Sequence, residues 1–195
     1  MQFPDMIADQ LLFQQTFGHG VLPSPKIPDP TVQMRRIKLV REEFSQEFSL
    51  AWDKCARAAK VDPDRLDLEQ HVEALAELGD AIADSIYVLI GTAFEYGIPL
   101  DKIWNAVQAA NMGKLWTYTE LINRFPEEMA SALAPPITLN NGWVVTIPGG
   151  NPPRTSEHRA YNVKDTIGKV QKPPGFTPPD IKQIIRDAIT RGTNA

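Results

Sequence analysis

The chain has 195 residues, of which 43% are hydrophobic and 23% are charged, and its formal net charge is −4. This length can bury one sizeable core, and the slightly acidic balance argues against a general nucleic-acid binder. The single cysteine, Cys55, excludes an internal disulfide, and no signal peptide or membrane-spanning apolar run is evident. We therefore expect a single cytoplasmic domain over residues 1–195, with no nucleic-acid and no membrane partner.

Apolar residues at helical spacing occupy the first two thirds of the chain. They predict helices at about 6–17, 30–59, 63–96, 100–115 and 117–133. Asp29-Pro30 is typical of a helix start, and Gly97 followed by Pro99 is typical of a helix end. The apolar side of the first long helix is predicted to contain Met34, Ile37, Val40, Phe44, Phe48, Ala51 and Trp52. The core stripe of the second is predicted to contain Val72, Leu75, Ile82, Ile86, Leu89, Ala93 and Phe94. Trp104 is also expected in the core, and Phe17 and Trp116 are candidates for stacking on the ring of a ligand.

The character of the chain changes after Pro135-Pro136. Residues 137–146 predict a small β-hairpin with Asn141-Gly142 at its turn. Residues 148–177 are rich in Pro and Gly and are expected to be mostly irregular, before a last helix from Asp180 to about Thr190. The sequence thus predicts an all-α fold built around two long antiparallel helices. Its helical core is at about 30–116, its extension at 117–164, and its C-terminal tail and helix at 165–195.

Carboxylates recur along the second long helix. Glu77, Asp80 and Asp84 follow one another at i, i+3 and i+7, which places them on one helix face. No Lys or Arg lies between Leu66 and Asp101 to pair with them. Because an isolated buried charge is costly, such acids must be paired, protonated or bound to a metal.

The first long helix carries a second set of acids, Glu43 and Glu47, spaced i, i+4 on one face. Carboxylates of two antiparallel helices could surround one or two divalent cations, and oxygen-only ligation favours Mg²⁺, with Mn²⁺ as a possible substitute. The alternative is an ordinary solvated helix face that consists of Glu69, Glu73, Glu77, Asp80 and Asp84. Spacing alone leaves both interpretations open.

Several motifs in the same order carry a family resemblance: Glu42-Glu43-x-x-x-Glu47, Glu77-x-x-Asp80-x-x-x-Asp84, Tyr87-x-x-x-Gly91-Thr92-Ala93, Asn111-Met112-Gly113-Lys114, and Gly168-Lys169-Val170-x-Lys172-Pro173-Pro174 with Pro178-Pro179-Asp180. Together they resemble the all-α nucleoside triphosphate pyrophosphohydrolases. More narrowly, the chain is similar to the MazG-like and phosphoribosyl-ATP pyrophosphohydrolase-like branch that is common in phages.

The resemblance implies a homodimer or homotetramer that hydrolyses a nucleoside triphosphate to the monophosphate and pyrophosphate with Mg²⁺. A phage-type member would fit remodelling of the deoxynucleotide pool, so a purine deoxynucleotide such as dGTP is the expected substrate, with a damaged nucleotide or an alarmone as the alternatives. The host cytoplasm is the expected place of action if a phage encodes the protein. Glu43, Glu77 and Asp80 match metal-ligand positions, and Asn111 and Lys114 match nucleotide-contacting positions. Lys169 and Lys172 are further substrate-binding candidates, whose alternative is a role as solvated loop lysines.

One departure from the family pattern concerns its first motif, whose second Glu usually stands three residues after the first. That position is Gln46 here, and Glu47 follows it. Either Glu47 takes the ligand role through a different local helix geometry, or Gln46 is a neutral ligand. Glu47 and Asp84 are both candidates for the catalytic base. The competing interpretations without catalysis are a helical interaction module with an acidic face, and a family member that binds nucleotide without turnover.

Overall fold

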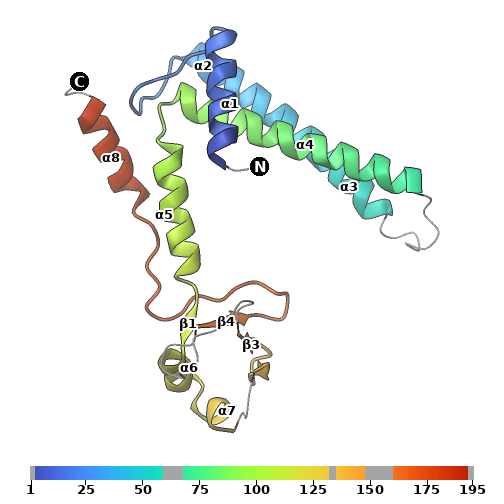
Figure 1. Ribbon diagram of the computed structural model, residues 1–195, viewed down its shortest axis with the longest axis vertical. Coiled ribbons are helices and arrows are strands. Elements are labelled where there is room, and N and C mark those ends of the chain that lie inside the picture. Colours follow the sequence, from blue (N-terminus) through green and yellow to red (C-terminus); the bar gives the residue numbers. More distant parts are fainter. Residues whose placement is uncertain (1–2, 59–67, 132–134, 148–159, 193–195) are drawn as a thin grey trace. The chain divides into compact units, whose positions relative to one another are not determined.

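The computed structural model describes residues 3–58, 68–131, 135–147 and 160–192 (Figure 1). These residues form two compact units. One contains the chain up to Lys102 together with the residues from Lys182 onward, and the other is Ile103–Ile181. Helices dominate, so the predicted all-α class is confirmed, with one small antiparallel sheet added. The assignment of residues 1–195 to a single domain stays a prediction.

The first unit is helical. Its elements are α1 (Phe3–Thr16), α2 (Pro30–Val40), the π-helix η1 (Arg41–Glu47), α3 (Phe48–Ala58), α4 (Leu68–Glu95), the first residues of α5 (Leu100–Met112), and α8 (Ile181–Gly192). The run from α2 through η1 to α3 is continuous, which confirms the predicted long helix. It begins as expected, because the Asp29 carboxylate accepts the backbone N–H groups of Thr31 at 2.9 Å and Val32 at 3.2 Å.

The end of α4 also follows the sequence signal. Gly97 adopts a φ of +63°, and a Cβ at this position would collide with the carbonyl oxygen of Ser24. The predicted break at 61–64 and the predicted start of this helix at Pro63 lie outside the described residues.

The run α2–η1–α3 and α4 lie antiparallel and side by side (Figure 1). Two ion pairs fix the direction: Arg35 near the start of α2 contacts Glu95 at the end of α4, whereas Lys54 of α3 contacts Glu77. The buried residues of the pair are mostly small: Ala51, Ala74, Ala81, Ser85, Gly91 and Ala93. Small side chains let two helix backbones approach closely.

This close approach corrects part of the predicted core stripes. Ala51 and Ala93 are buried as predicted, and Val40, Phe48, Ile86 and Phe94 are partly buried. The other large apolar side chains of the stripes lie at the surface instead: Met34, Ile37, Phe44, Trp52, Val72, Leu75, Ile82 and Leu89 are all exposed. The two helices meet through their small residues, so the larger side chains are left outside the contact. The core assignment of Trp104 is likewise wrong, since 49% of this residue is exposed.

The second unit has its own core. After the rest of α5 it contains β1 (Trp116–Thr117), α6 (Tyr118–Arg124), α7 (Pro126–Ser131), β2 (Ile137–Thr138), β3 (Val144–Thr146) and β4 (Ala160–Lys164). The antiparallel sheet has the order β1-β4-β3-β2. Trp116, Leu121, Val145 and Val163 are fully buried beside it. Trp116 is therefore a core residue rather than a base-stacking surface.

The predicted hairpin is confirmed, with Ile137 opposite Val145. Its loop has three residues, Asn140 to Gly142, because Leu139 and Trp143 pair through a 2.8 Å hydrogen bond and Gly142 takes a φ of +79°. The described part of residues 148–177 is mostly irregular, as predicted, but the sequence did not reveal the strand β4, whose Tyr161 and Val163 face the core.

The predicted helix 117–133 is two short helices rather than one. Pro126 follows Phe125, whose φ of −135° and ψ of 60° are not helical. A proline disfavours the α conformation of the residue before it, so α6 ends there and α7 begins at Pro126 itself. At its other end, α6 begins with a capping box between Thr117 and Glu120.

Candidate active site

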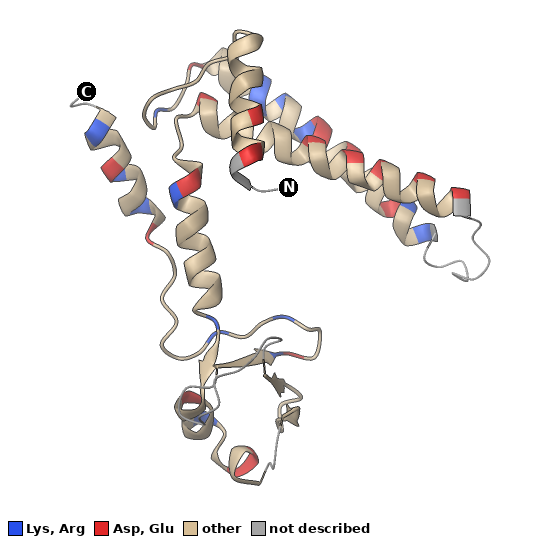
Figure 2. Cartoon of the chain, viewed as in Figure 1, with Lys and Arg blue, Asp and Glu red and all other residues tan. Residues whose placement is uncertain are grey.

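An acidic cleft of about 530 Å³ lies between α3 and α4. Its walls consist of Glu47, Leu50, Ala51, Lys54, Arg57, Glu77, Asp80 and Ala81. Figure 2 shows the acidic residues that recur along α4. The structure therefore brings three sequence-predicted site residues, Glu47, Glu77 and Asp80, together with two cations that the sequence analysis did not single out.

The π-helix η1 determines where Glu47 lies. The N–H of Phe48 donates to the carbonyl of Glu43, five residues earlier. A π-helix thus holds one more residue in each hydrogen-bonded turn than an α-helix does, and such turns are frequent at functional sites. The extra residue matches the extra position between the two Glu residues of the first motif. Glu47 lines the acidic cleft, whereas Gln46 lines a separate groove.

Glu43 experiences the charge of its acidic neighbours. Partial burial raises the pKa of the Glu43 carboxyl, and the negative charges of Glu47 and Asp84 raise it further. A side-chain hydrogen bond with Glu47 acts in the same direction. Acids of η1 and α4 therefore converge closely enough to disfavour ionisation of Glu43, which is the electrostatic condition that a bound cation relieves.

Lys54 supplies positive charge to the stripe of acids on α4. Its Nζ lies 2.5 Å from Glu77 Oε1 and 3.4 Å from Glu73 Oε1. The sequence of the second long helix contains no Lys or Arg between Leu66 and Asp101, so it offers these acids no such partner. The partner comes from the facing helix, so part of the stripe is an exposed ion pair, as the solvated-face alternative expects.

The donor set determines which metal the cleft could hold. Glu43, Glu47, Glu77 and Asp80 offer only carboxylate oxygens, which suit a hard divalent cation. Among the residues that the structure describes, no three Asp, Glu, His or Cys side chains are gathered as a metal site. Glu43 is partly buried, the other three acids are exposed, and Glu77 is paired with Lys54. The residues fit Mg²⁺ by their chemistry and by their place on facing elements, although their side chains do not enclose an ion.

The remaining sequence-predicted residues belong to the second unit. Lys114 Nζ donates to Asn111 Oδ1 at 2.8 Å, so these two nucleotide-contacting candidates lie side by side at the end of α5. The backbone N–H of Lys169 donates to the Asp165 carboxylate at 2.9 Å. Lys172 Nζ lies 4.7 Å from the centre of the Phe176 ring, in cation–π contact.

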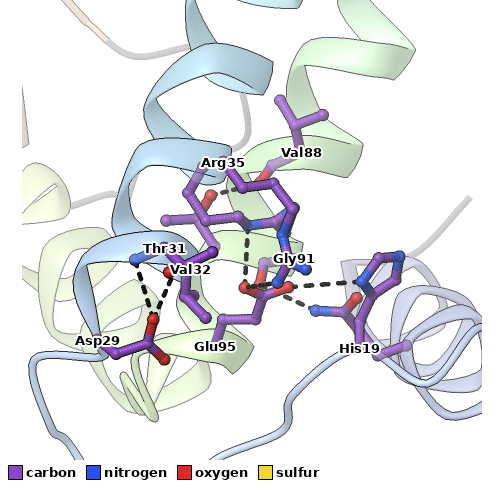
Figure 3. A network of polar contacts seen from close by, with 11 residues as sticks. His19, Asp29, Thr31, Val32, Arg35, Val88, Gly91 and Glu95 are labelled. Carbon is purple, nitrogen blue, oxygen red and sulfur yellow. Dashed lines mark hydrogen bonds and ion pairs between the residues drawn. The ribbon is translucent and has the colours of Figure 1, made fainter.

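A second polar cluster of the first unit is buried, and the sequence analysis missed it (Figure 3). Glu95 is 2% exposed, and its Oε2 lies 2.7 Å from Arg35 Nη2 and 3.8 Å from Arg36 Nε. His19 Nδ1 lies 3.9 Å from Oε1 of the same carboxylate. Gln14 of α1 donates to the carbonyl of Gly91 at 3.1 Å. These contacts attach α1 and α2 to the end of α4.

The comparison with protein families identifies the helical part of the chain. The model of the phosphoribosyl-ATP pyrophosphohydrolases matches residues 12–111, which are 100 of the 195 residues. The chain belongs to this family. The matched range contains the acidic cleft, the buried Glu95 cluster and Asn111, and it ends before the sheet of the second unit. The family connects the fold with pyrophosphohydrolase chemistry on a nucleotide. No curated protein matches the chain.

Among the helices that the structure describes, none is both long enough and apolar enough to cross a bilayer. The cytoplasmic location stays a prediction.

Proposed function

We propose that the protein hydrolyses a nucleoside triphosphate to the monophosphate and pyrophosphate in a Mg²⁺-dependent reaction at the acidic cleft. The observation that carries the proposal is the convergence of acids from η1 and α4 on one cleft, in a chain of the phosphoribosyl-ATP pyrophosphohydrolase family. The cleft also contains Lys54 and Arg57, which suit an anionic substrate.

Glu43, Glu47, Glu77 and Asp80 are the residues that would hold the metal. Mg²⁺ bound there would neutralise phosphate oxygens and lower the pKa of the attacking water, and Mn²⁺ would substitute for it. Glu47 or Asp84 would accept the proton of that water. The electrostatic coupling of both acids to Glu43 supports a shared site, because a bound cation would offset the negative charges that raise the pKa of the Glu43 carboxyl.

The proposed substrate is a ribo- or deoxyribonucleoside triphosphate, and a purine nucleotide such as dGTP is the preferred one. Asn111 and Lys114 would contact the nucleotide, and Lys169 and Lys172 would add positive charge for its phosphates. The hydrogen bond between Lys114 and Asn111 supports a shared role for these two residues. The cytoplasm, where nucleoside triphosphates are abundant, is the proposed place of action.

The protein is further proposed to act as a homodimer or homotetramer. The supporting observation is the set of large apolar side chains that the helix pair leaves at the surface. Exposed apolar residues spaced along two neighbouring helices are typical of a surface that another chain covers. The mass of the protein in solution, measured by light scattering, tests this proposal.

Product analysis tests the activity. Each of the common ribonucleoside and deoxyribonucleoside triphosphates is incubated with the protein, once with Mg²⁺ and once with a chelator. Metal-dependent release of monophosphate and pyrophosphate is expected, and it should disappear in Glu77→Gln and Asp80→Asn variants that keep the wild-type circular dichroism spectrum. Release of diphosphate and orthophosphate would contradict the reaction type. No turnover of any of them would favour a binding role.

A further inference from the structure

Lys54 occupies an unusual position for a surface lysine. Its Nζ is bound to Glu77, which is the carboxylate that the proposed function assigns to the metal. The two side chains are 44% and 47% exposed, so water screens their ion pair and makes it weak. A divalent cation that binds Glu77 therefore competes with this ammonium group for the same oxygen, and the ammonium group is the partner that can leave.

Arg57 lies one helical turn after Lys54 on α3 and lines the same cleft. Its Nε donates to the backbone carbonyl of Asp53 at 3.4 Å. Between Leu66 and Asp101 the facing chain contains no Lys or Arg. Positive side chains in this cleft are therefore supplied by α3.

We propose that Lys54 has two partners in sequence: it pairs with Glu77 while the cleft is free of metal, and it binds substrate phosphate oxygens together with Arg57 once a divalent cation takes Glu77. The proposal rests on the proposed function and assigns the phosphate-binding cations of that site. The flexible stem and the three donors of a lysine let its ammonium group turn from one partner to the other without movement of the backbone.

The exchange lets Lys54 offset negative charge in both states of the cleft. In the metal-free state the ammonium group offsets part of the negative charge of Glu73 and Glu77. When the cation arrives, the carboxylates are neutralised and the polyphosphate brings new negative charge. Lys54 and Arg57 are then available for the phosphate oxygens of the substrate. Such charge-assisted hydrogen bonds to phosphate oxygens are among the strong ones.

The test uses two affinities that should change in opposite directions in Lys54→Met. This variant keeps most of the aliphatic stem and loses the charge. Calorimetric titration with Mn²⁺ alone should show tighter binding than in the wild type, because no ammonium group competes for Glu77. Titration of the Mn²⁺-saturated protein with inorganic tripolyphosphate should show binding that is about tenfold weaker, through the loss of a charge-assisted hydrogen bond.

Two further variants separate the two roles. Arg57→Met should weaken tripolyphosphate binding and leave the Mn²⁺ affinity unchanged. Lys38→Met, which removes a lysine from the separate groove that Gln46 lines, should change neither affinity. All variants should unfold at the wild-type temperature, since the altered side chains lie on the surface.

Unchanged Mn²⁺ affinity in Lys54→Met would overturn the competition, and unchanged tripolyphosphate affinity would overturn the phosphate role. The proposed function is judged by a different measurement, the release of pyrophosphate from nucleotides by the wild type. Wild-type protein that shows both affinities but releases no pyrophosphate would therefore contradict the proposed function and not the role of Lys54.

Discussion

Two carboxylates of α4, Glu95 and Glu77, each meet basic side chains of the preceding helical run, and their surroundings differ in one decisive respect. Glu95 is almost fully buried and has two arginines within 4 Å. Glu77 is about half exposed and has one lysine, in a cleft that holds further acids. The negative charge of Glu95 is compensated by its two arginines. The cleft around Glu77 contains three acids and two basic residues, so negative charge is in excess there. We infer that the buried cluster holds the helices together and that the exposed one is free to bind a ligand.

Removal of Glu95 is expected to have the largest effect on stability. Glu95→Ala leaves Arg36 buried without its carboxylate, and burial already lowers the pKa of this guanidinium against the opposing effect of Glu95. The loss should be about 3–5 kcal/mol in the free energy of unfolding, measured by urea denaturation. Glu73→Ala, which removes an exposed acid from Lys54, should cost less than about 1 kcal/mol. Equal losses would abolish the distinction between the two sites.

The neighbouring residues Gln46 and Glu47 test the exposed site. Glu47→Gln should lower metal-dependent turnover by about 100-fold or more, since the residue lines the cleft as a proposed ligand or base. Gln46→Ala should keep turnover within about twofold, because Gln46 lines another groove and surface substitutions usually have small effects. Initial rates of pyrophosphate release are the measurement. The reverse order of effects would assign the ligand position to Gln46.

Two glycines of α4 provide a matched test of packing. A Cβ at Gly91 would collide with the Arg36 guanidinium and approach the Gln10 side-chain nitrogen to 2.7 Å, so Gly91→Ala should destabilise the fold by about 1–3 kcal/mol. Gly79 has no neighbour within 4 Å of a Cβ. Gly79→Ala should therefore stabilise the helix by about 0.5–1 kcal/mol. Thermal unfolding of both variants, followed by circular dichroism, measures the difference. A stabilising Gly91→Ala would show that the buried cluster is loosely packed.

The smallest expected effect is the pH dependence caused by Glu43. Its pKa in the folded protein is raised above the ordinary value of 4.5, so its contribution to stability is present at low pH. That contribution is lost as the pH rises through the raised pKa, because the ionised carboxylate then faces Glu47 and Asp84. Metal-free Glu43→Gln should gain stability relative to the wild type between pH 4.5 and pH 7. A difference in melting temperature that does not change with pH would contradict this coupling.

The local signals of the sequence were sufficient for much of the fold. Asp29 and Gly97 identified a helix start and a helix end, and Asn141-Gly142 identified the hairpin, because caps and turns depend on neighbouring residues alone. The strand β4 was missed because it pairs with β1 and β3, which lie far from it in the sequence. The core stripes were predicted only in part, for a related reason: periodicity shows which residues share a face, but not which of them meet the partner helix.

The same division holds for the site. The sequence by itself determined the spacing of Glu77, Asp80 and Asp84 on one helix face, and with it the family resemblance that the family comparison confirmed. Only the tertiary structure decided that Lys54 is the partner of Glu77 and that the π-helix directs Glu47 into the cleft. The physical reason is that spacing within a helix follows from a fixed backbone geometry. Contacts between helices depend instead on their rotation and register, which packing of the whole unit sets.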